Sequence, residues 1–104
     1  MSGAHPRHDL DELLQSPVRF SILAALSSVG EAEFAFIRDT VEVSDSTLSK
    51  QVTVLEGAGY VHVKKGYVGK RPRTWLSLTP QGRERFARQL ATLRRIAEQV
   101  AVSD

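Results

Sequence analysis

The feature that most constrains the fold is a stretch between Gly57 and Pro80 without any acidic residue, although acidic and basic side chains nearly balance over the whole chain. Two segments within it, 60–65 and 74–79, are rich in β-branched and aromatic residues, as strands are. The loop between them, 66–73, is expected to lie outside the sheet because it is rich in glycine and proline. The stretch therefore predicts a short β-hairpin whose basic residues are Lys64, Lys65, Lys70, Arg71 and Arg73.

Composition limits the size of the fold and the kind of partner. A chain of 104 residues with 41% hydrophobic residues predicts one small domain, and a partner subunit would help it to bury apolar surface. Charge is unevenly distributed: residues 1–56 contain nine acidic and four basic residues, whereas residues 57–104 contain three acidic and ten basic residues. Only the second half suits a partner that carries phosphate groups.

Several classes of site are not expected. The chain has no cysteine, which excludes disulfides, thiolate metal sites and a cysteine nucleophile. Neither a metal site nor a cofactor is predicted, because His5 and His8 lie in the expected tail and His62 lies on a predicted strand. No base or nucleophile accompanies the acidic residues, so an enzyme is not expected. The chain start lacks a signal-peptide core and no apolar run reaches membrane-spanning length, which favours a cytoplasmic location.

The N-terminal part contains a clear helix start. Ser16 is a favourable N-cap, and Pro17 at the first helical position gives up no hydrogen bond, so a helix is predicted over 17–28. Residues 1–8 are predicted to be a disordered tail. A short amphipathic helical segment follows this tail and carries Leu10, Leu13 and Leu14.

Two further helices are predicted before the hairpin. A very short strand at 31–33 and a helix over 33–41 come first. A third helix is predicted from Ser44, a good N-cap, to Gly57. Its apolar positions share one face, and its other side chains include Ser46, Thr47, Ser49, Lys50 and Gln51, of which Gln51 lies towards the inner face.

The C-terminal part predicts a long helix over 80–104, because Thr79 and Pro80 repeat the cap-then-proline signal. Apolar residues recur along it at spacings of four, three, four and three, at Phe86, Leu90, Leu93, Ala97 and Val100. We interpret this seam, together with Leu10, Leu13 and Leu14, as a contact between subunits. The alternative is that the seam packs back onto the first helix of its own chain.

The order of these elements predicts a winged helix-turn-helix over 9–79, a mainly α fold with a small β-hairpin, followed by a C-terminal dimerisation helix. The major groove of B-DNA admits one α-helix, so the polar helix is expected to present Ser46, Thr47, Ser49, Lys50 and Gln51 to base edges, with Ser44 beside a phosphate. The basic hairpin would reach the minor groove or its phosphates. A hairpin tip whose charges only keep it solvated is the alternative.

Residues 43–61, from Val43-Ser-Asp-Ser-Thr-Leu-Ser-Lys-Gln to Gly-Tyr-Val, resemble the short winged-helix transcriptional regulators of bacteria and archaea related to the MarR and ArsR families. The wing Lys65-Gly-Tyr-Val-Gly-Lys-Arg-Pro-Arg-Thr and the start Leu78-Thr-Pro-Gln-Gly-Arg complete the resemblance over roughly residues 16–96. It implies a homodimeric regulator that binds double-stranded DNA, with a recognition helix over 44–57 and a wing over 61–78. The chain lacks the cysteine and paired histidine ligands of metal-sensing ArsR relatives, and no effector is assigned.

A second function remains open, a winged-helix module that binds proteins and not DNA. It would use the apolar seam or Trp75. Trp75 lies out of phase with Leu76 and Leu78, so it is either exposed for a partner or a half-buried prop for the hairpin.

Overall fold

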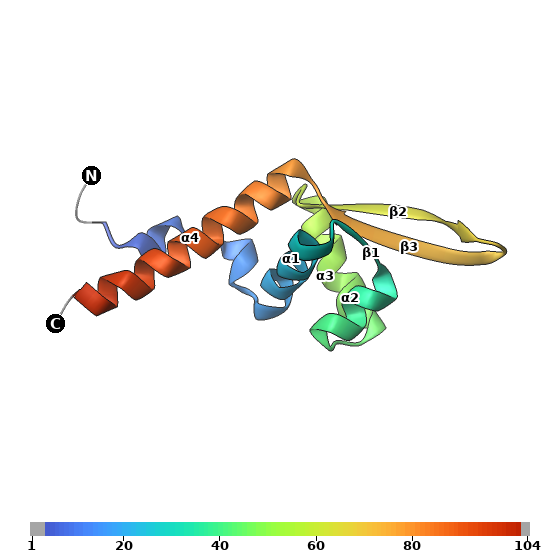
Figure 1. Cartoon of the computed structure of the whole chain (residues 1–104), viewed down its shortest axis with the longest axis horizontal. Helices are drawn as coiled ribbons and strands as arrows, with labels where there is room; N and C mark the ends of the chain where they lie inside the picture. Colours follow the sequence, from blue (N-terminus) through green and yellow to red (C-terminus); the bar gives the residue numbers. More distant parts are fainter. Residues whose placement is uncertain (1–3, 103–104) are drawn as a thin grey trace.

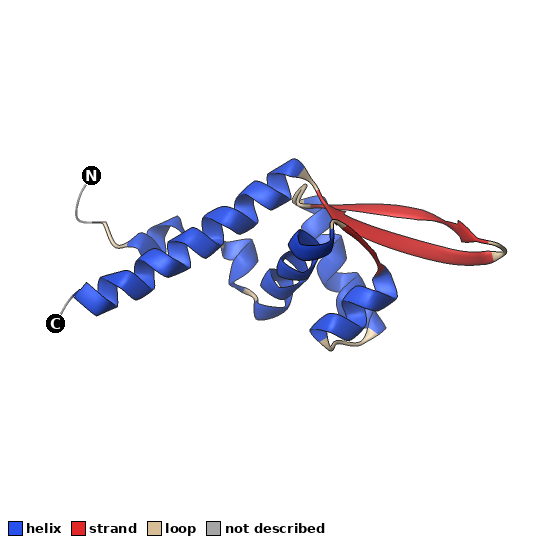
Figure 2. Cartoon of the chain, viewed as in Figure 1, coloured by secondary structure: helices blue, strands red, loops and turns tan. Residues whose placement is uncertain are grey.

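The computed structural model describes residues 4–102, with side chains described as far as Gln99. Within these residues it contains four α-helices, two short 3-10 helices and one three-stranded sheet (Figure 2). The elements are η1 (Pro6–Asp9), η2 (Glu12–Gln15), α1 (Pro17–Val29), β1 (Glu31–Glu33), α2 (Phe34–Val41), α3 (Asp45–Gly57), β2 (Val61–Val68), β3 (Arg71–Leu78) and α4 (Pro80–Val102). The predicted mainly α fold with a hairpin and a long C-terminal helix is confirmed.

The side chains of α1, α2 and α3 enclose the core of the domain. Ile22 and Leu26 of α1, Ile37 of α2, and Leu48 and Leu55 of α3 are fully buried. Each such side chain contributes about 1.5–3 kcal/mol to folding through the surface it removes from water. The core therefore holds α3 by its inner face and leaves its polar face in contact with solvent.

Hydrogen bonds and an ion pair hold the turn between α2 and α3. Glu42 ends α2 in the left-handed conformation, with φ of 59°, and its amide donates to the carbonyl of Arg38. The Arg38 side chain then donates to Asp45, the first residue of α3, at 2.8 Å, and to Asp39 at 2.9 Å. The bond from Arg38 lowers the pKa of the Asp39 carboxyl. These contacts join α2 and α3 as a helix-turn-helix.

The sheet has the strand order β1-β3-β2, and all neighbours are antiparallel. Ala32 and Val63 both lie opposite Leu76, which is fully buried. The hairpin strands run on past the sheet into a two-stranded ribbon that extends away from the helices (Figure 1). We call the hairpin of β2 and β3 the wing. The sheet anchors the base of the wing, and the outer part of the wing extends into solvent.

The predicted loop over 66–73 is wrong, because most of it belongs to the strands and the turn consists of Gly69 and Lys70. β1 pairs with β3 only as far as Trp75, so beyond that residue one edge of β3 is open and Pro72 is tolerated there. Gly66 lies against the ring of Trp75, where an added Cβ would be 3.2 Å from the ring. The open edge therefore explains Pro72 within β3, and the packing of the Trp75 ring explains Gly66 within β2.

The N-terminal segment is bound to α4 by hydrogen bonds. The Asp11 amide donates to the Gln89 side chain at 2.9 Å, and the phenol of Tyr60 donates to the Asp11 carboxylate at 2.5 Å. Burial and the bond to Asp11 raise the pKa of Tyr60. Asp9 pairs with Arg95 at 2.7 Å. The predicted disordered tail is therefore wrong for residues 6–8, which form η1, while residues 1–3 lie outside the described residues.

Gly82, in the first turn of α4, packs directly against the chain that enters β2. An added Cβ at this position would lie 2.0 Å from the carbonyl oxygen of Tyr60. The same turn is capped by Thr79, whose hydroxyl accepts from the Gly82 amide at 2.9 Å. Gly82 therefore permits the close approach of α4 to the base of the wing.

Replacing Gly82 with alanine is expected to lower the free energy of unfolding by about 3 kcal/mol, the upper range for overpacking, because backbone atoms have to move. Urea denaturation measures this destabilisation. Gly57→Ala is the matched control, since an added Cβ there meets no atom within 4 Å, and its stability should stay equal to the wild type or rise. Equal stability of the Gly82→Ala and Gly57→Ala variants would contradict the close packing described.

Candidate nucleic-acid interface

The outer face of α3 carries small polar side chains and one lysine. Ser46, Ser49 and Lys50 are exposed, and Thr47 is half-buried. Among residues 4–102, Lys50 forms no ion pair. The face therefore offers hydroxyl groups and an uncompensated positive charge to a partner, with the partly exposed Val54 one helical turn after Lys50.

Ser44 precedes this face, and its hydroxyl is engaged within the chain. It accepts a hydrogen bond from the Thr47 amide at 3.1 Å and donates to the Thr47 hydroxyl at 3.0 Å. This geometry confirms the predicted N-cap. A phosphate beside Ser44 remains a prediction. The backbone amides in the first turn of α3 would bind it.

Gln51 lies behind the outer face of α3 and is half-buried. Its side-chain oxygen accepts from Arg19 of α1 at 2.8 Å, and Arg19 also donates to the carbonyl of Leu13 at 2.6 Å. This bond ties Gln51 to α1, and the predicted role of Gln51 in reading bases stays a prediction. Nothing in the sequence indicates this role of Arg19, because no local pattern shows that its side chain bonds to both η2 and α3.

Two of the five basic residues of the wing are paired with acidic residues of β1. Lys64 lies 3.3 Å from Glu31 and above the ring of Trp75, and Arg73 lies 3.1 Å from Glu33. Trp75 itself is half-buried, which confirms its interpretation as a prop for the hairpin. Lys64 and Arg73 therefore brace the base of the wing, and part of their charge is compensated.

The other three basic residues are Lys65, Lys70 and Arg71. They are exposed, and within residues 4–102 they form no ion pair. Lys70 lies in the turn, and Arg71 is the first residue of β3. The outer part of the wing thus carries uncompensated positive charge well beyond the helical core (Figure 1).

The predicted subunit seam on α4 is only partly available. Phe86 packs against Phe20 of its own domain, with ring centroids 5.2 Å apart, and Leu14 is only 2% exposed in the core. The assignment of Leu14 to a subunit contact is corrected, since its own chain buries it. Phe86 is half-buried and packs on the first helix, as the alternative predicted. The remaining positions are the half-buried Leu10, Leu13 and Leu90 and the exposed Leu93 and Ala97, whereas the Val100 side chain lies outside the described residues.

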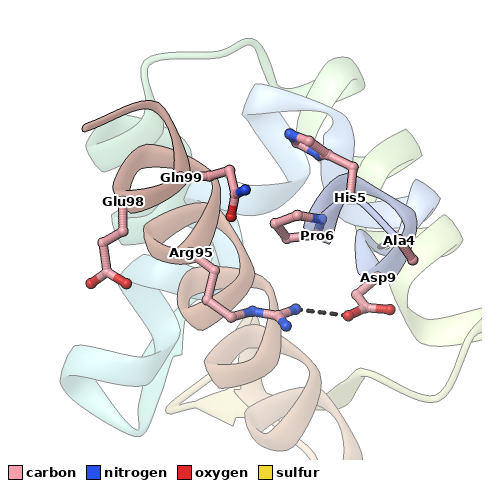
Figure 3. Close-up of a pocket in the computed structure, with 7 residues that line it drawn as sticks. All are labelled: Ala4, His5, Pro6, Asp9, Arg95, Glu98 and Gln99. Carbon is pink, nitrogen blue, oxygen red and sulfur yellow. Dashed lines mark hydrogen bonds and ion pairs between the residues drawn. The ribbon is translucent and has the colours of Figure 1, made fainter. Parts of the chain in front are cut away.

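A surface groove of about 670 Å³ lies between η1 and the C-terminal part of α4 (Figure 3). Charged and polar side chains form much of its lining, and the Asp9–Arg95 pair spans it.

Among residues 4–102 no group of histidine, aspartate and glutamate side chains is arranged to hold a metal ion. In the same part of the chain no helix combines the length and the apolar character needed to cross a membrane.

Comparison with known proteins supports the interpretation of the fold as a winged helix. A family described as winged helix DNA-binding domain matches residues 18–97. An uncharacterized protein of Methanocaldococcus jannaschii is 26% identical over 86% of this chain and 97% of its own length. A transcriptional regulator homologue from Pyrococcus horikoshii has a TM-score of 0.81 and 29% identity, over 86% of this chain and 89% of that one.

Structures with lower identity show the same fold. The transcriptional repressor CouR, solved bound to a 23-mer DNA duplex, has a TM-score of 0.75 and 21% identity, over 94% of this chain and 69% of that one. A MarR-family transcriptional regulator from Silicibacter pomeroyi also shares the fold. The predicted resemblance to winged-helix regulators is confirmed, and this chain belongs to the family of winged helix DNA-binding domains found in transcriptional regulators.

Proposed function

We propose that the protein is a sequence-specific transcriptional regulator that binds double-stranded DNA as a homodimer. The observation that carries this proposal is the pairing of two free basic surfaces on one domain. The outer face of α3 offers Lys50 among exposed hydroxyl groups, and the projecting wing offers Lys65, Lys70 and Arg71. Neither surface is needed to close the hydrophobic core.

The two surfaces suit different parts of a duplex. The major groove is about 12 Å wide and accepts a helix, so Ser46, Ser49 and Lys50 would reach base edges or the flanking phosphates. The wing would lie along the neighbouring minor groove, where the negative potential attracts Lys70 and Arg71. Contacts of α3 would select the sequence, and contacts of the wing would mainly add affinity.

Dimerisation would come from the part of α4 that extends beyond the domain. The molecule is 60 Å long, with α4 at one end and the wing at the other (Figure 1). Leu93 is 40% exposed and lies on one face of α4 with Leu90 and Ala97. A two-fold contact along this seam would place two copies of α3 in successive major grooves, about one helical turn or 34–36 Å apart.

The wing supplies a direct test with matched charges. Lys70→Ala with Arg71→Ala removes two free cations, and Lys64→Ala with Arg73→Ala removes two cations that are paired with Glu31 and Glu33. We expect the first variant to bind a selected duplex about tenfold more weakly than the second. For the Lys70→Ala/Arg71→Ala variant, the slope of log affinity against log salt concentration should become less steep by about 0.9 for each phosphate that the wing no longer neutralises. Anisotropy titrations at several salt concentrations measure both values, and equal affinities of the two variants would argue against the assigned wing surface.

A binding module for proteins is the second candidate function. The apolar side chains of Val29 and Phe36 are about half exposed, and they line a shallow surface depression together with Trp75. Such a patch suits a protein partner. A mobility shift with genomic fragments at moderate salt separates the two functions, because a protein-binding module would leave the DNA unretarded at micromolar concentration.

A further inference from the structure

We propose that Tyr67 and Val68 form an apolar wedge at the tip of the wing that enters the minor groove and partly unstacks a base step. This inference rests on the proposed function and assigns residues for which the charge pattern gave no role. Tyr67 is 72% exposed and Val68 is 54% exposed, next to the free cations Lys70 and Arg71. We call these two apolar residues the tip wedge.

Folding does not account for an aromatic residue at position 67. Along β2, Val61 is buried at 2% exposure, Val63 is half-buried and Tyr67 is mostly exposed, although all three lie on the same strand face. The buried part of that face ends at Leu76, the partner of Val63. Tyr67 lies four residues further out, beyond the reach of the core, so its ring contributes little to stability.

The tip also presents the wedge in a defined geometry. The two-residue turn begins with Gly69 at φ of +63°, and a turn that begins with glycine matches the twist of a hairpin. Tyr67 lies opposite Pro72, and Val68 lies opposite Arg71. Successive residues of a strand point to opposite faces, so Tyr67 and Pro72 share one face of the tip and Val68 lies on the other. Proline and the turn restrict the backbone, so little conformational freedom is lost when the tip binds.

The charge of the tip selects the occupant. Lys65, Lys70 and Arg71 surround the apolar pair, and the strands between Gly57 and Pro80 contain no acid that could repel phosphates. Minor-groove proteins combine such cations with apolar side chains that wedge between base steps. An anionic lipid surface also attracts aromatic and basic residues together. We favour duplex DNA, because the tip belongs to the same domain as the exposed α3 face and to a family of DNA-binding domains.

The test compares two exposed aromatic residues in the full chain. Tyr67→Ala removes the tip wedge ring, and Phe36→Ala removes a ring that is 50% exposed outside the proposed interface. We expect Tyr67→Ala to bind the selected duplex about tenfold more weakly, in the range for removal of one aromatic ring that stacks on a base, with an unchanged salt slope. Tyr67→Phe and Phe36→Ala should bind as the wild type does. Permanganate should modify a thymine at the wing site with the wild type and not with Tyr67→Ala.

Each remaining outcome decides the inference. If the wild type binds the duplex, the Lys70→Ala/Arg71→Ala variant loses affinity and Tyr67→Ala binds like Phe36→Ala, the tip wedge is wrong and the proposed function stands. If the wild type binds no duplex from a random pool, both fail. Binding of the wild type to vesicles of phosphatidylserine and phosphatidylcholine, abolished in Tyr67→Ala without any effect on DNA affinity, would overturn the wedge in favour of a lipid contact.

Discussion

Replacing both Leu90 and Leu93 with glutamate is expected to give a monomer that binds a selected duplex about a thousandfold more weakly than the wild type. Two carboxylates on each seam would have to be buried against their copies, which like-charge repulsion and desolvation oppose. A monomer engages one half-site at a time, so it lacks the gain from simultaneous binding. Sedimentation velocity gives the mass, and anisotropy titration gives the affinity.

The control for this variant carries the same added charge on another face of α4. Ala87 and Ala91 are exposed and lie about a quarter to a third of a turn from the seam by the helical period. Ala87→Glu with Ala91→Glu should remain dimeric and lose only the affinity that two extra negative charges cost. A dimeric mass for the Leu90→Glu/Leu93→Glu variant would place the subunit contact elsewhere.

Removing the polar face of α3 is expected to abolish sequence preference while leaving general DNA binding. Ser46→Ala, Ser49→Ala and Lys50→Ala together should reduce affinity for the selected duplex by about a thousandfold, to the level of a scrambled duplex. The free basic residues of the wing would still bind phosphates, so the salt dependence should persist with one fewer neutralised phosphate per subunit. Alanine favours a helix, so the variant should fold.

Titration of the selected and scrambled duplexes in parallel measures this change. The control is Ser28→Ala with Lys64→Ala, because Ser28 lies near the end of α1 and Lys64 is paired with Glu31. It should keep the preference of the wild type for the selected sequence. If the α3 variant also keeps that preference, another surface reads the bases.

Local signals in the sequence predicted the helices well. Ser16 and Ser44 cap their helices as expected, because a serine hydroxyl accepts an amide hydrogen bond from a residue only three positions later. The inner face of α3 follows from the helical period, and Leu48 and Leu55 are buried as that period requires. Such features depend on neighbours along the chain, so a sequence can specify them.

The features of the wing that the sequence did not reveal arise from contacts between distant segments. Counting charges treated Lys64 and Arg73 like Lys70 and Arg71, but β1 places Glu31 and Glu33 beside the first pair. That placement depends on the register of β1 against β3, which no local pattern reveals. The same register leaves the edge of β3 open at Pro72, whereas Gly66 is explained by the Trp75 ring that packs on it.

The errors on α4 arise because polar residues form the face that packs on the domain. Gln89 and Thr92 are 3% and 1% exposed, and Gln89 is bonded to the N-terminal segment. A search for apolar periodicity therefore selected the neighbouring face of Leu90 and Leu93 and included Phe86 at its border. Polar residues can occupy a buried helix face when their hydrogen bonds are made within the fold.

The most direct test of the central claim is selection of bound duplexes from a random pool, followed by footprinting of the selected complex with hydroxyl radicals. The proposal predicts a pseudo-palindromic site with two protected half-sites about one helical turn apart. It also predicts that the triple alanine variant of α3 gives no footprint on this site. Recovery of no preferred sequence, with unretarded DNA at micromolar protein, would contradict the proposal that this winged helix reads DNA.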